Sequence, residues 1–409
     1  MVLTLEDCRK VIYKHTNGKG KVKAFKISSL GDEPMGFLGE HYKLKITYED
    51  IATKEMKFAR FFLKTVPNSN PNHMQYVNEM GVFKKEALLY KNLISNFVKF
   101  HNKPIAPKCY LVQADKFIVL EDLSSKGFTI PDMDLSLAHW EAVIQTMARF
   151  HASCIIFEEQ RYATQSYRVN EFYRDELKES TFSPLENHPR YKWALNTSKA
   201  IADSMKLVNC ENQENQEKIK QFVSKKMLNY TKASKEYRNV ITHADLWRNN
   251  IMFRQTQEEL DCIFIDFQLA RYVPAAFDIL TTLHVNASSH FLDTHMEGLL
   301  RLYYNVFRES LELKKIEVDR VMTYDQFMES IKEYQLPALV EATMFATICF
   351  VGPELSNLIL DDEDVFNEFN YTNRSKFIQQ EFKENINFRE KYSDIMMRLI
   401  SVLDQSQIE

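Results

Sequence analysis

An aspartate and an asparagine in the segment 242–251 have the spacing that phosphoryl transfer to a hydroxyl requires. The pattern is H-x-D, formed by His243 and Asp245, and Asn250 follows five residues after the aspartate. Phosphoryl transfer needs one group that orients the attacking hydroxyl and oxygen ligands that hold magnesium. Asp245 suits the first role, because its carboxylate accepts a hydrogen bond from the acceptor hydroxyl and takes its proton. Asn250 offers an amide oxygen, which a hard cation prefers.

A second carboxylate follows at the end of a short apolar strand pattern. Asp266 comes sixteen residues after Asn250 and directly follows residues 262–265, so it can reach the other side of the metal. It opens the sequence D-F-Q, in the place of the D-F-G segment of protein kinases. The H-x-D-x-x-x-x-N pattern alone is loose, and Asp266 makes it specific. We therefore predict Asp245 as the catalytic residue and Asn250 and Asp266 as ligands of Mg²⁺.

A lysine upstream supplies positive charge for a triphosphate, and a glutamate that follows it is the candidate ion-pair partner of this lysine. Lys64 lies near the end of the strand pattern over residues 58–66, and Glu86 follows 22 residues later on a helical pattern over residues 82–90. Alone, such a lysine is more often a solvated residue and such a glutamate a surface one. Their order before the catalytic segment predicts an ion pair that holds Lys64 against the α- and β-phosphates of ATP.

The elements that must position these residues change in character near residue 123. Strand patterns precede it at residues 42–48, 58–66 and 117–120. After it, helical patterns cover residues 137–157, 212–237 and 342–353, and a short hairpin pattern lies at residues 251–253 and 262–265. The chain is therefore predicted to be α+β, with a β-rich lobe over residues 1–123 and a mainly helical lobe over residues 124–409.

Composition and charge exclude several other classes of protein. The 409 residues are 45% hydrophobic with a net charge of -4, which leaves no excess of cations for a nucleic-acid binder. The six cysteines form no CxxC pair and are expected to be reduced thiols. The beginning of the chain lacks the apolar core of a secretory signal, and the apolar stretch 342–353 is shorter than the roughly 20 residues of a membrane span. We expect a cytoplasmic protein without a membrane span.

Taken together, these segments resemble the protein-kinase-like superfamily, and within it the ecdysteroid kinase-like group of small-molecule kinases. The residues that carry the resemblance are Gly36 to Gly39, Lys64, Glu86, Leu120 to Leu123, Ala148 to Ala152, His243 to Asn250, Ile265 to Arg271 and Phe277 to Leu280. The resemblance implies a bilobal protein-kinase-like fold that uses ATP and Mg²⁺.

The resemblance also assigns roles that spacing alone does not. It implies that Glu121 and Leu123 present hinge backbone groups to adenine, and that Gly36 and Gly39 lie over the phosphates. For Asp278 it implies a brace for the catalytic loop, whereas the local sequence equally fits a helix N-cap. His151, inside an apolar helical run, is expected to be a hydrogen-bonded core residue.

The sequence does not identify the alcohol that accepts the phosphoryl group. The resemblance and the many Leu, Phe, Tyr and Met residues over 280–350 favour an apolar alcohol acceptor such as an ecdysteroid. A choline, ethanolamine or aminoglycoside kinase is the closest alternative, and carboxylates around a cationic acceptor would distinguish it. A catalytically inactive nucleotide-binding scaffold is an alternative of another class. The oligomeric state is not predicted.

Overall fold

The computed structural model describes residues 3–30, 39–67, 71–162 and 168–406, and the chain divides into two compact units. Unit 1 comprises Met1–Asp132, Tyr167–Lys178 and Asn250–Gln268. Unit 2 comprises Met133–Ser166, Glu179–Asn249 and Leu269–Glu409. Two of the boundaries, at 249/250 and 268/269, fall inside the segments that the sequence assigns to the site.

Unit 1 is built on a five-stranded antiparallel sheet with the order β1-β2-β3-β5-β4. Its strands are β1 (Gly20–Ser29), β2 (Glu40–Asp50), β3 (Met56–Thr65), β4 (Cys109–Gln113) and β5 (Phe117–Glu121). Buried and exposed residues alternate along β2 and β3, as expected for strands with one covered face. The predicted strands at 42–48, 58–66 and 117–120 therefore correspond to β2, β3 and β5.

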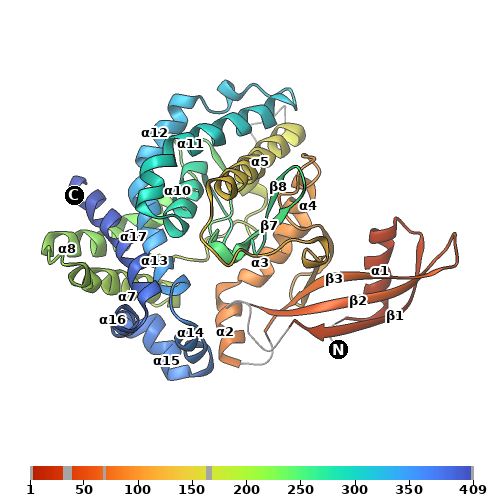
Figure 1. The fold of residues 1–409 in the computed structure, drawn as a ribbon, viewed down its shortest axis with the longest axis horizontal. Coiled ribbons are helices and arrows are strands. Elements are labelled where there is room, and N and C mark those ends of the chain that lie inside the picture. Colours follow the sequence, from red (N-terminus) through yellow and green to blue (C-terminus); the bar gives the residue numbers. More distant parts are fainter. Residues whose placement is uncertain (1–2, 31–38, 68–70, 163–167, 407–409) are drawn as a thin grey trace. The chain divides into compact units, whose positions relative to one another are not determined.

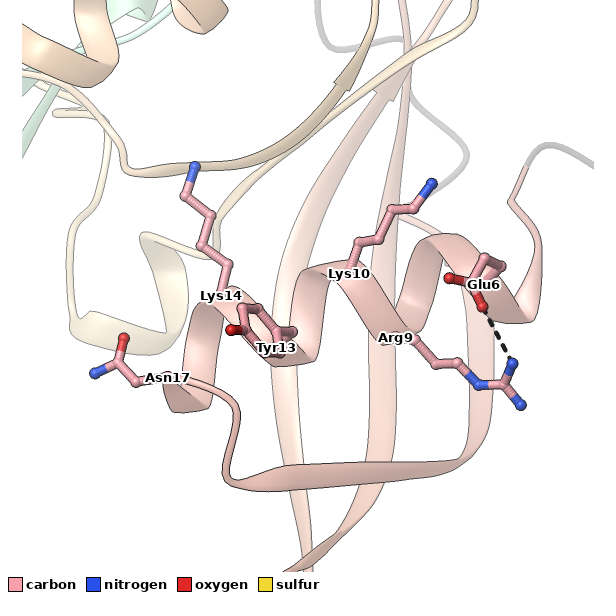
Figure 2. Close-up of a pocket in the computed structure, with 6 residues that line it drawn as sticks. All are labelled: Glu6, Arg9, Lys10, Tyr13, Lys14 and Asn17. Carbon is pink, nitrogen blue, oxygen red and sulfur yellow. Dashed lines mark hydrogen bonds and ion pairs between the residues drawn. The ribbon is translucent and has the colours of Figure 1, made fainter.

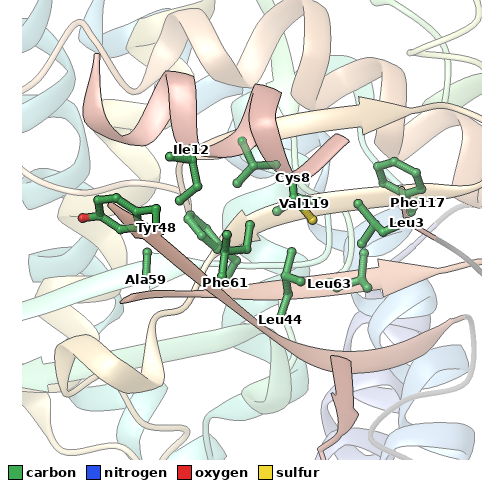
Figure 3. Close-up of a cluster of buried hydrophobic side chains, with 12 residues drawn as sticks. Leu3, Cys8, Ile12, Leu44, Tyr48, Ala59, Phe61, Leu63, Phe117 and Val119 are labelled. Atoms are coloured by element: carbon green, nitrogen blue, oxygen red, sulfur yellow. The ribbon is translucent and has the colours of Figure 1, made fainter. Parts of the chain in front are cut away.

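Helix α1 (Leu5–Thr16) covers one face of this sheet (Figure 1). It begins with a capping box, in which the Thr4 side chain accepts from the Asp7 amide and the Asp7 side chain accepts from the Thr4 amide. Figure 3 shows the apolar core between the helix and the strands, which includes Cys8 and Ile12 from α1 and Phe61 from β3. The sequence reading did not identify α1, β1 or β4.

The remaining elements of unit 1 carry the glutamate and the metal-ligand candidates. The helical ones are α2 (Pro71–Met80), α3 (Val82–Leu89), the π-helical turn η1 (Tyr90–Ile94), α4 (Ser95–Phe97), the 3-10 turn η2 (Ser124–Lys126) and α6 (Val169–Phe172). Strands β7 (Ile251–Gln255) and β8 (Leu260–Phe264) form the predicted hairpin, with Ile251 opposite Phe264. Its apolar side chains Met252 and Ile263 pack against Leu123.

Unit 2 is mainly helical, apart from the pair β6 (Asn239–Thr242) and β9 (Arg271–Pro274). Its helices are α5 (Leu137–Tyr162), α7 (Pro189–Ser204), α8 (Gln213–Gln221), α9 (Met227–Tyr230), α10 (Ala275–Asn286), α11 (Ser289–Glu312), α12 (Tyr324–Glu333), α13 (Gln335–Cys349), α14 (Pro353–Asp361), α15 (Glu363–Asn367), α16 (Arg374–Glu384) and α17 (Ile386–Gln405). Helix α5 packs against α11, and α13 packs between α10 and α17. The α+β class predicted from the sequence is confirmed.

Two predicted helices end earlier than their patterns indicate. The pattern over 212–237 becomes α8, a π-helical turn and α9, which ends at Tyr230. Beyond it the Ser234 hydroxyl accepts from the Tyr237 amide and the Asn239 side chain accepts from the Ser234 amide, which replaces helical hydrogen bonds. The buried helix predicted over 342–353 is α13, which ends at Cys349, since Pro353 begins α14. Within the described ranges no single helix is long and apolar enough to span a membrane, and only the pair α13 and α14, bent by 84°, passes on length and composition together.

Candidate active site

Lys64 lies in unit 1 between two carboxylates. Its Nζ donates to Oε2 of Glu86 at 2.7 Å and to Oδ1 of Asp266 at 2.7 Å. Strand β3 provides the lysine and α3 the glutamate, and the aspartate lies two residues after the end of β8. The side chains of Lys64 and Glu86 are 4% and 1% exposed, whereas that of Asp266 is 25% exposed. The predicted pairing of Lys64 with Glu86 is therefore present, and Asp266 joins it.

The charges of this cluster are strongly interdependent. Burial alone would lower the pKa of the Lys64 ammonium group, but the neighbouring charges of Asp266 and Glu86 raise it above its ordinary value. Burial raises the pKa of the Glu86 carboxyl to about 7, against the opposing effect of Lys64, and the charge of Asp266 adds to the rise. The single positive charge of Lys64 therefore neutralises only one carboxylate when Glu86 and Asp266 are both ionised. This excess of negative charge suits an additional cation.

Gly39 approaches the lysine side chain closely. A Cβ atom added at this glycine would lie 3.0 Å from Cε and 3.3 Å from Cγ of Lys64. Any larger residue would therefore have to displace the lysine stem, so the contact explains a glycine at this position. Gly36, the other glycine assigned to the phosphates, lies outside the described residues.

The hairpin β7–β8 brings the two metal-ligand candidates to one end. Asn250 immediately precedes β7, and Asp266 follows β8 by two residues. The Ile265 amide donates to the Asn250 carbonyl at 3.0 Å, which fixes the two chain segments side by side at this end. One amide and one carboxylate oxygen donor are the kind of ligands that Mg²⁺ accepts. Asp266 adopts a left-handed conformation with φ of 67°, a strained state that aspartate tolerates better than most residues.

Asp245 lies in unit 2, on the loop between β6 and the unit boundary, and is half-buried. The preceding residue, Ala244, has φ of 61°, which is costly for alanine. Asp278 on α10 holds this loop, because its carboxylate accepts the His243 and Ala244 amides, each at 2.8 Å. The N-cap alternative for Asp278 is wrong, since α10 begins at Ala275 and Asp278 lies within it.

Asp278 is itself held by a buried histidine. His151 Nε2 lies 3.1 Å from Oδ2 of Asp278, and His151 Nδ1 lies 2.8 Å from the Tyr303 hydroxyl. Burial would raise the pKa of the Asp278 carboxyl, but the hydrogen bond and charge of His151, together with His243, lower it. Asp278 is therefore kept ionised. His151 is fully buried, as expected for a hydrogen-bonded core residue.

A second contact of α10 with the loop was missed in the sequence. The Asn286 side-chain amide donates to the Leu246 carbonyl at 2.8 Å, on the other side of Asp245. The only signal was its position eight residues after Asp278 on the same helix, just over two turns along. Asp245 also lies near Cys349 at the end of α13, where desolvation and the Asp245 charge raise the pKa of the thiol.

The two residues assigned to the hinge lie in and just beyond β5. The Glu121 amide donates to the Lys108 carbonyl at 2.8 Å, and its carboxylate forms an ion pair with Lys126. The Leu123 carbonyl accepts from the Lys126 and Phe128 amides, and its side chain is buried. Their role toward adenine stays a prediction.

A pocket of unit 1 lies along α1 and the turn that follows it, and none of the residues assigned to the site lines it (Figure 2). Its lining consists of Glu6, Arg9, Lys10, Tyr13, Lys14 and Asn17. Arg9 donates to Glu6 at 3.1 Å, and Lys14 donates to the Cys109 carbonyl at 2.7 Å. Among the residues that the structure describes, no group of three or more His, Cys, Asp or Glu side chains is arranged to hold a metal ion.

Comparison with protein families gives the class of protein. The profile of the ecdysteroid kinase-like family matches residues 35–316, well over half of the chain. The chain therefore belongs to the ecdysteroid kinase-like family, the one that its motifs resemble. Membership defines it as a kinase-like protein of the small-molecule phosphotransferase class. No match was found among curated proteins.

Solved structures with some similarity come from small-molecule kinases. One is an aminoglycoside phosphotransferase with bound ADP, at 15% identity and a TM-score of 0.32, with 84% of this chain and 99% of that chain covered. A microcompartment-associated aminopropanol kinase has 12% identity and a TM-score of 0.36, with 94% and 99% covered. A choline/ethanolamine kinase family protein from Mesorhizobium loti has 12% identity and a TM-score of 0.34, with 91% and 92% covered.

Proposed function

We propose that the protein transfers the γ-phosphate of ATP to a hydroxyl of a small, mostly apolar alcohol. The observation that carries the proposal is the position of Lys64, which donates to both Glu86 and the partly exposed Asp266 at 2.7 Å. An ammonium group has three N–H donors, and these two carboxylates take two of them. The third donor suits a phosphate oxygen, and Glu86 keeps the lysine in place when it binds.

Asn250 and Asp266 would hold Mg²⁺ at the end of the β7–β8 hairpin. When bound, the ion neutralises the charge of the triphosphate. Asp266 has two functions in this proposal, since one carboxylate oxygen accepts from Lys64 while the carboxylate also faces the metal. Gly36 and Gly39 would cover the phosphates, and Glu121 and Leu123 would contact adenine through backbone groups. In this assignment residues 1–123 bind the nucleotide.

Asp245 would orient the acceptor hydroxyl and take its proton. A general base of this kind must be held in one geometry, and the loop around Asp245 is fastened on both sides. Asp278 accepts the two amides that precede it, and Asn286 donates to the carbonyl that follows it. Residues 124–409 would also supply the acceptor site. The proposed acceptor is an ecdysteroid-like alcohol, and the proposed compartment is the cytoplasm.

The chemical assignment is tested with Asp245→Asn. Turnover is expected to fall by about 10²–10⁴-fold, the usual contribution of a positioned base. The thermal stabilisation by Mg-ATP is expected to remain, because Asp245 is assigned to the hydroxyl rather than to the nucleotide. Asp132→Asn, at an exposed position, is the matched control. Wild-type turnover in Asp245→Asn would refute the assignment.

The acceptor is tested separately, by phosphate transfer from ATP to 20-hydroxyecdysone, choline and an aminoglycoside under equal conditions. Steroid phosphate as the main product supports the proposal. Efficient phosphorylation of choline or the aminoglycoside without a steroid product would overturn the acceptor class and leave the kinase chemistry intact. Binding of Mg-ATP with no phosphorylated product from any acceptor would favour the inactive scaffold.

A further inference from the structure

One face of the β1–β3 sheet carries an unusual row of cations. Helix α1 and the apolar core cover the other face. In the strand register Lys26 of β1 lies opposite Lys45 of β2, and Lys45 lies opposite Arg60 of β3. Lys43 lies two residues before Lys45 and therefore on the same face. All four side chains are exposed, and we call Lys26, Lys43, Lys45 and Arg60 the cation face.

This arrangement has an electrostatic cost. Neighbouring strands are only about 4.8 Å apart, and like charges that lie directly opposite each other destabilise a sheet. Two other lysines of these strands are compensated, Lys23 by Glu49 at 2.7 Å and Lys57 by Asp50 at 2.8 Å. In the part of the chain that the structure describes, no member of the cation face forms an ion pair.

An exposed aromatic ring lies among these cations. Phe58 on β3 is 53% exposed. The Lys45 Nζ lies 4.3 Å from its ring centroid and the Arg60 Cζ lies 5.3 Å from it. Cation–π attraction of this kind holds both charges beside the ring. Basic side chains around an exposed aromatic ring are the composition of surfaces that bind at the lipid–water interface.

We propose that the cation face docks the protein on the surface of an anionic phospholipid bilayer. Protection of an edge strand explains only Lys26, because Lys43, Lys45 and Arg60 lie on the inner strands β2 and β3. The backbone amides of paired strands are hydrogen-bonded within the sheet and cannot bind an anion. The face therefore offers only the charges of flexible side chains, which do not form a fixed site for one anion. A leaflet of lipid phosphates presents a plane of negative charge, which such a face fits.

The cation face is distinct from the residues assigned to the nucleotide. Lys64 lies on the same side of β3, four residues beyond Arg60, a separation of about 13 Å along a strand. Lys43 is nearer to it, because Lys43 lies opposite Phe62, two residues before Lys64. Lys64 is also buried and paired with carboxylates, whereas Arg60 is exposed. Docking through the cation face therefore needs none of the residues assigned to ATP.

The experiment is co-sedimentation of the full chain with phosphatidylcholine vesicles that contain or lack phosphatidylserine. Binding is expected only to the anionic vesicles and is expected to weaken at high salt. The triple variant Lys26→Glu, Lys45→Glu, Arg60→Glu should partition on the order of 100-fold more weakly, since each basic residue near such a leaflet contributes about fivefold. Lys192→Glu, Lys199→Glu, Lys314→Glu changes the net charge equally at exposed positions of unit 2 and should bind like the wild type.

Three outcomes would overturn the proposal. Equal binding of the two triple variants would assign the effect to net charge. Loss of Mg-ATP stabilisation in the cation-face variant, with its thermal unfolding otherwise unchanged, would make the face part of the nucleotide site. Binding of an acidic polypeptide such as polyglutamate, without binding to anionic vesicles, would assign the face to a protein partner. Phe58→Ala gives a second measurement, because it keeps the charges and is expected to weaken vesicle binding by a smaller factor.

Discussion

Each unit contains a cluster in which one buried cation lies between two carboxylates, and the two clusters differ in their geometry. In unit 1, Lys64 contacts Glu86 and Asp266 through a single nitrogen. In unit 2, Arg271 donates through both terminal nitrogens to Glu341, at 3.2 and 2.8 Å, and its Nε lies 3.4 Å from Glu179. A bidentate guanidinium pair is fixed in one geometry, whereas an ammonium group can change partners.

The difference teaches which cluster can accept a ligand. Arg271 is 1% exposed and Glu341, its bidentate partner, is 2% exposed, whereas the second carboxylate, Glu179, is 17% exposed. The Asp266 side chain is 25% exposed, and it contacts Lys64 through one hydrogen bond from Nζ. The Arg271 cluster therefore suits a structural brace, and the Lys64 cluster suits exchange of partners with a phosphate and a metal ion. Equivalent substitutions made in each of the two clusters test this contrast.

The largest effect on stability is expected from Arg271→Met. It leaves Glu341 and Glu179 without their cation, and breaking a buried pair in this way costs about 3–5 kcal/mol. Urea denaturation measures the loss in free energy of unfolding. Arg301→Met is the control, because its pair with Glu297 is exposed and is expected to contribute less than about 1 kcal/mol. Similar losses in the two variants would contradict a structural role for Arg271.

Lys64→Met is expected to cost less stability, about 1–3 kcal/mol. Asp266 is 25% exposed, so its carboxylate keeps contact with water when the lysine is removed. The main effect should appear with the nucleotide, since the stabilisation by Mg-ATP, about 2.7 kcal/mol at a hundredfold excess over Kd, is expected to vanish. A Mg-ATP shift of wild-type size in Lys64→Met would exclude Lys64 from the nucleotide site.

The pH dependence of stability reports on both clusters, because burial raises the pKa of the Glu86 and Glu341 carboxyls to about 7. Both values lie above those of the unfolded chain, so the folded state binds more protons, and its stability falls as pH rises from about 4.5 to about 7. Glu86→Gln and Glu341→Gln should each reduce this slope, which is at most about 1.4 kcal/mol per pH unit for one group. Denaturation at a series of pH values measures it.

Activity should distinguish the same two variants. Ionised Glu86 is the form that pairs fully with Lys64, so kcat/KM is expected to rise as pH increases through about 7. Glu86→Gln should lose this rise, and Glu341→Gln should keep it. A rise that disappears in Glu341→Gln alone would reverse the roles assigned to the two clusters.

The smallest effect is expected from Thr181→Val in the Arg271 cluster. The Thr181 hydroxyl accepts from an Arg271 terminal nitrogen at 3.3 Å, and that nitrogen also donates to Glu341. Loss of one such bond costs about 0.5–1.5 kcal/mol. The Mg-ATP shift should be unchanged, and Thr181→Ser, which keeps the hydroxyl, should retain wild-type stability. A changed Mg-ATP shift would show that the two clusters are coupled.

The order of residues along the chain predicts the pairing of Lys64 with Glu86 but not that of Arg271 with Glu341. Strand β3 and helix α3 have clear periodicities, so Lys64 and Glu86 were identifiable as a pair across 22 residues. Arg271 and Glu341 are 70 residues apart, and no spacing pattern relates them. Their pairing depends on the packing of helices in unit 2, which a single sequence does not specify.

Local chemistry also explains where the predicted elements differ from the observed ones. The end of α9 at Tyr230 depends on side-chain hydrogen bonds beyond it, and the end of α13 at Cys349 depends on the proline that begins the next helix. The contact of Asn286 with Leu246 was not predictable, because an asparagine near a helix end is common for local reasons. The positive φ values of Ala244 and Asp266 also leave no trace in the sequence, since neither residue is a glycine.

The left-handed backbone of Asp266 restricts which residues can replace it during evolution. The proposed role as a metal ligand would by itself permit glutamate, but glutamate rarely adopts φ near the observed 67°. Glycine accepts that backbone but has no oxygen ligand, and asparagine accepts it but loses the charge. In a library with all twenty residues at this position, aspartate alone satisfies both demands, and asparagine should be the best-tolerated replacement for folding.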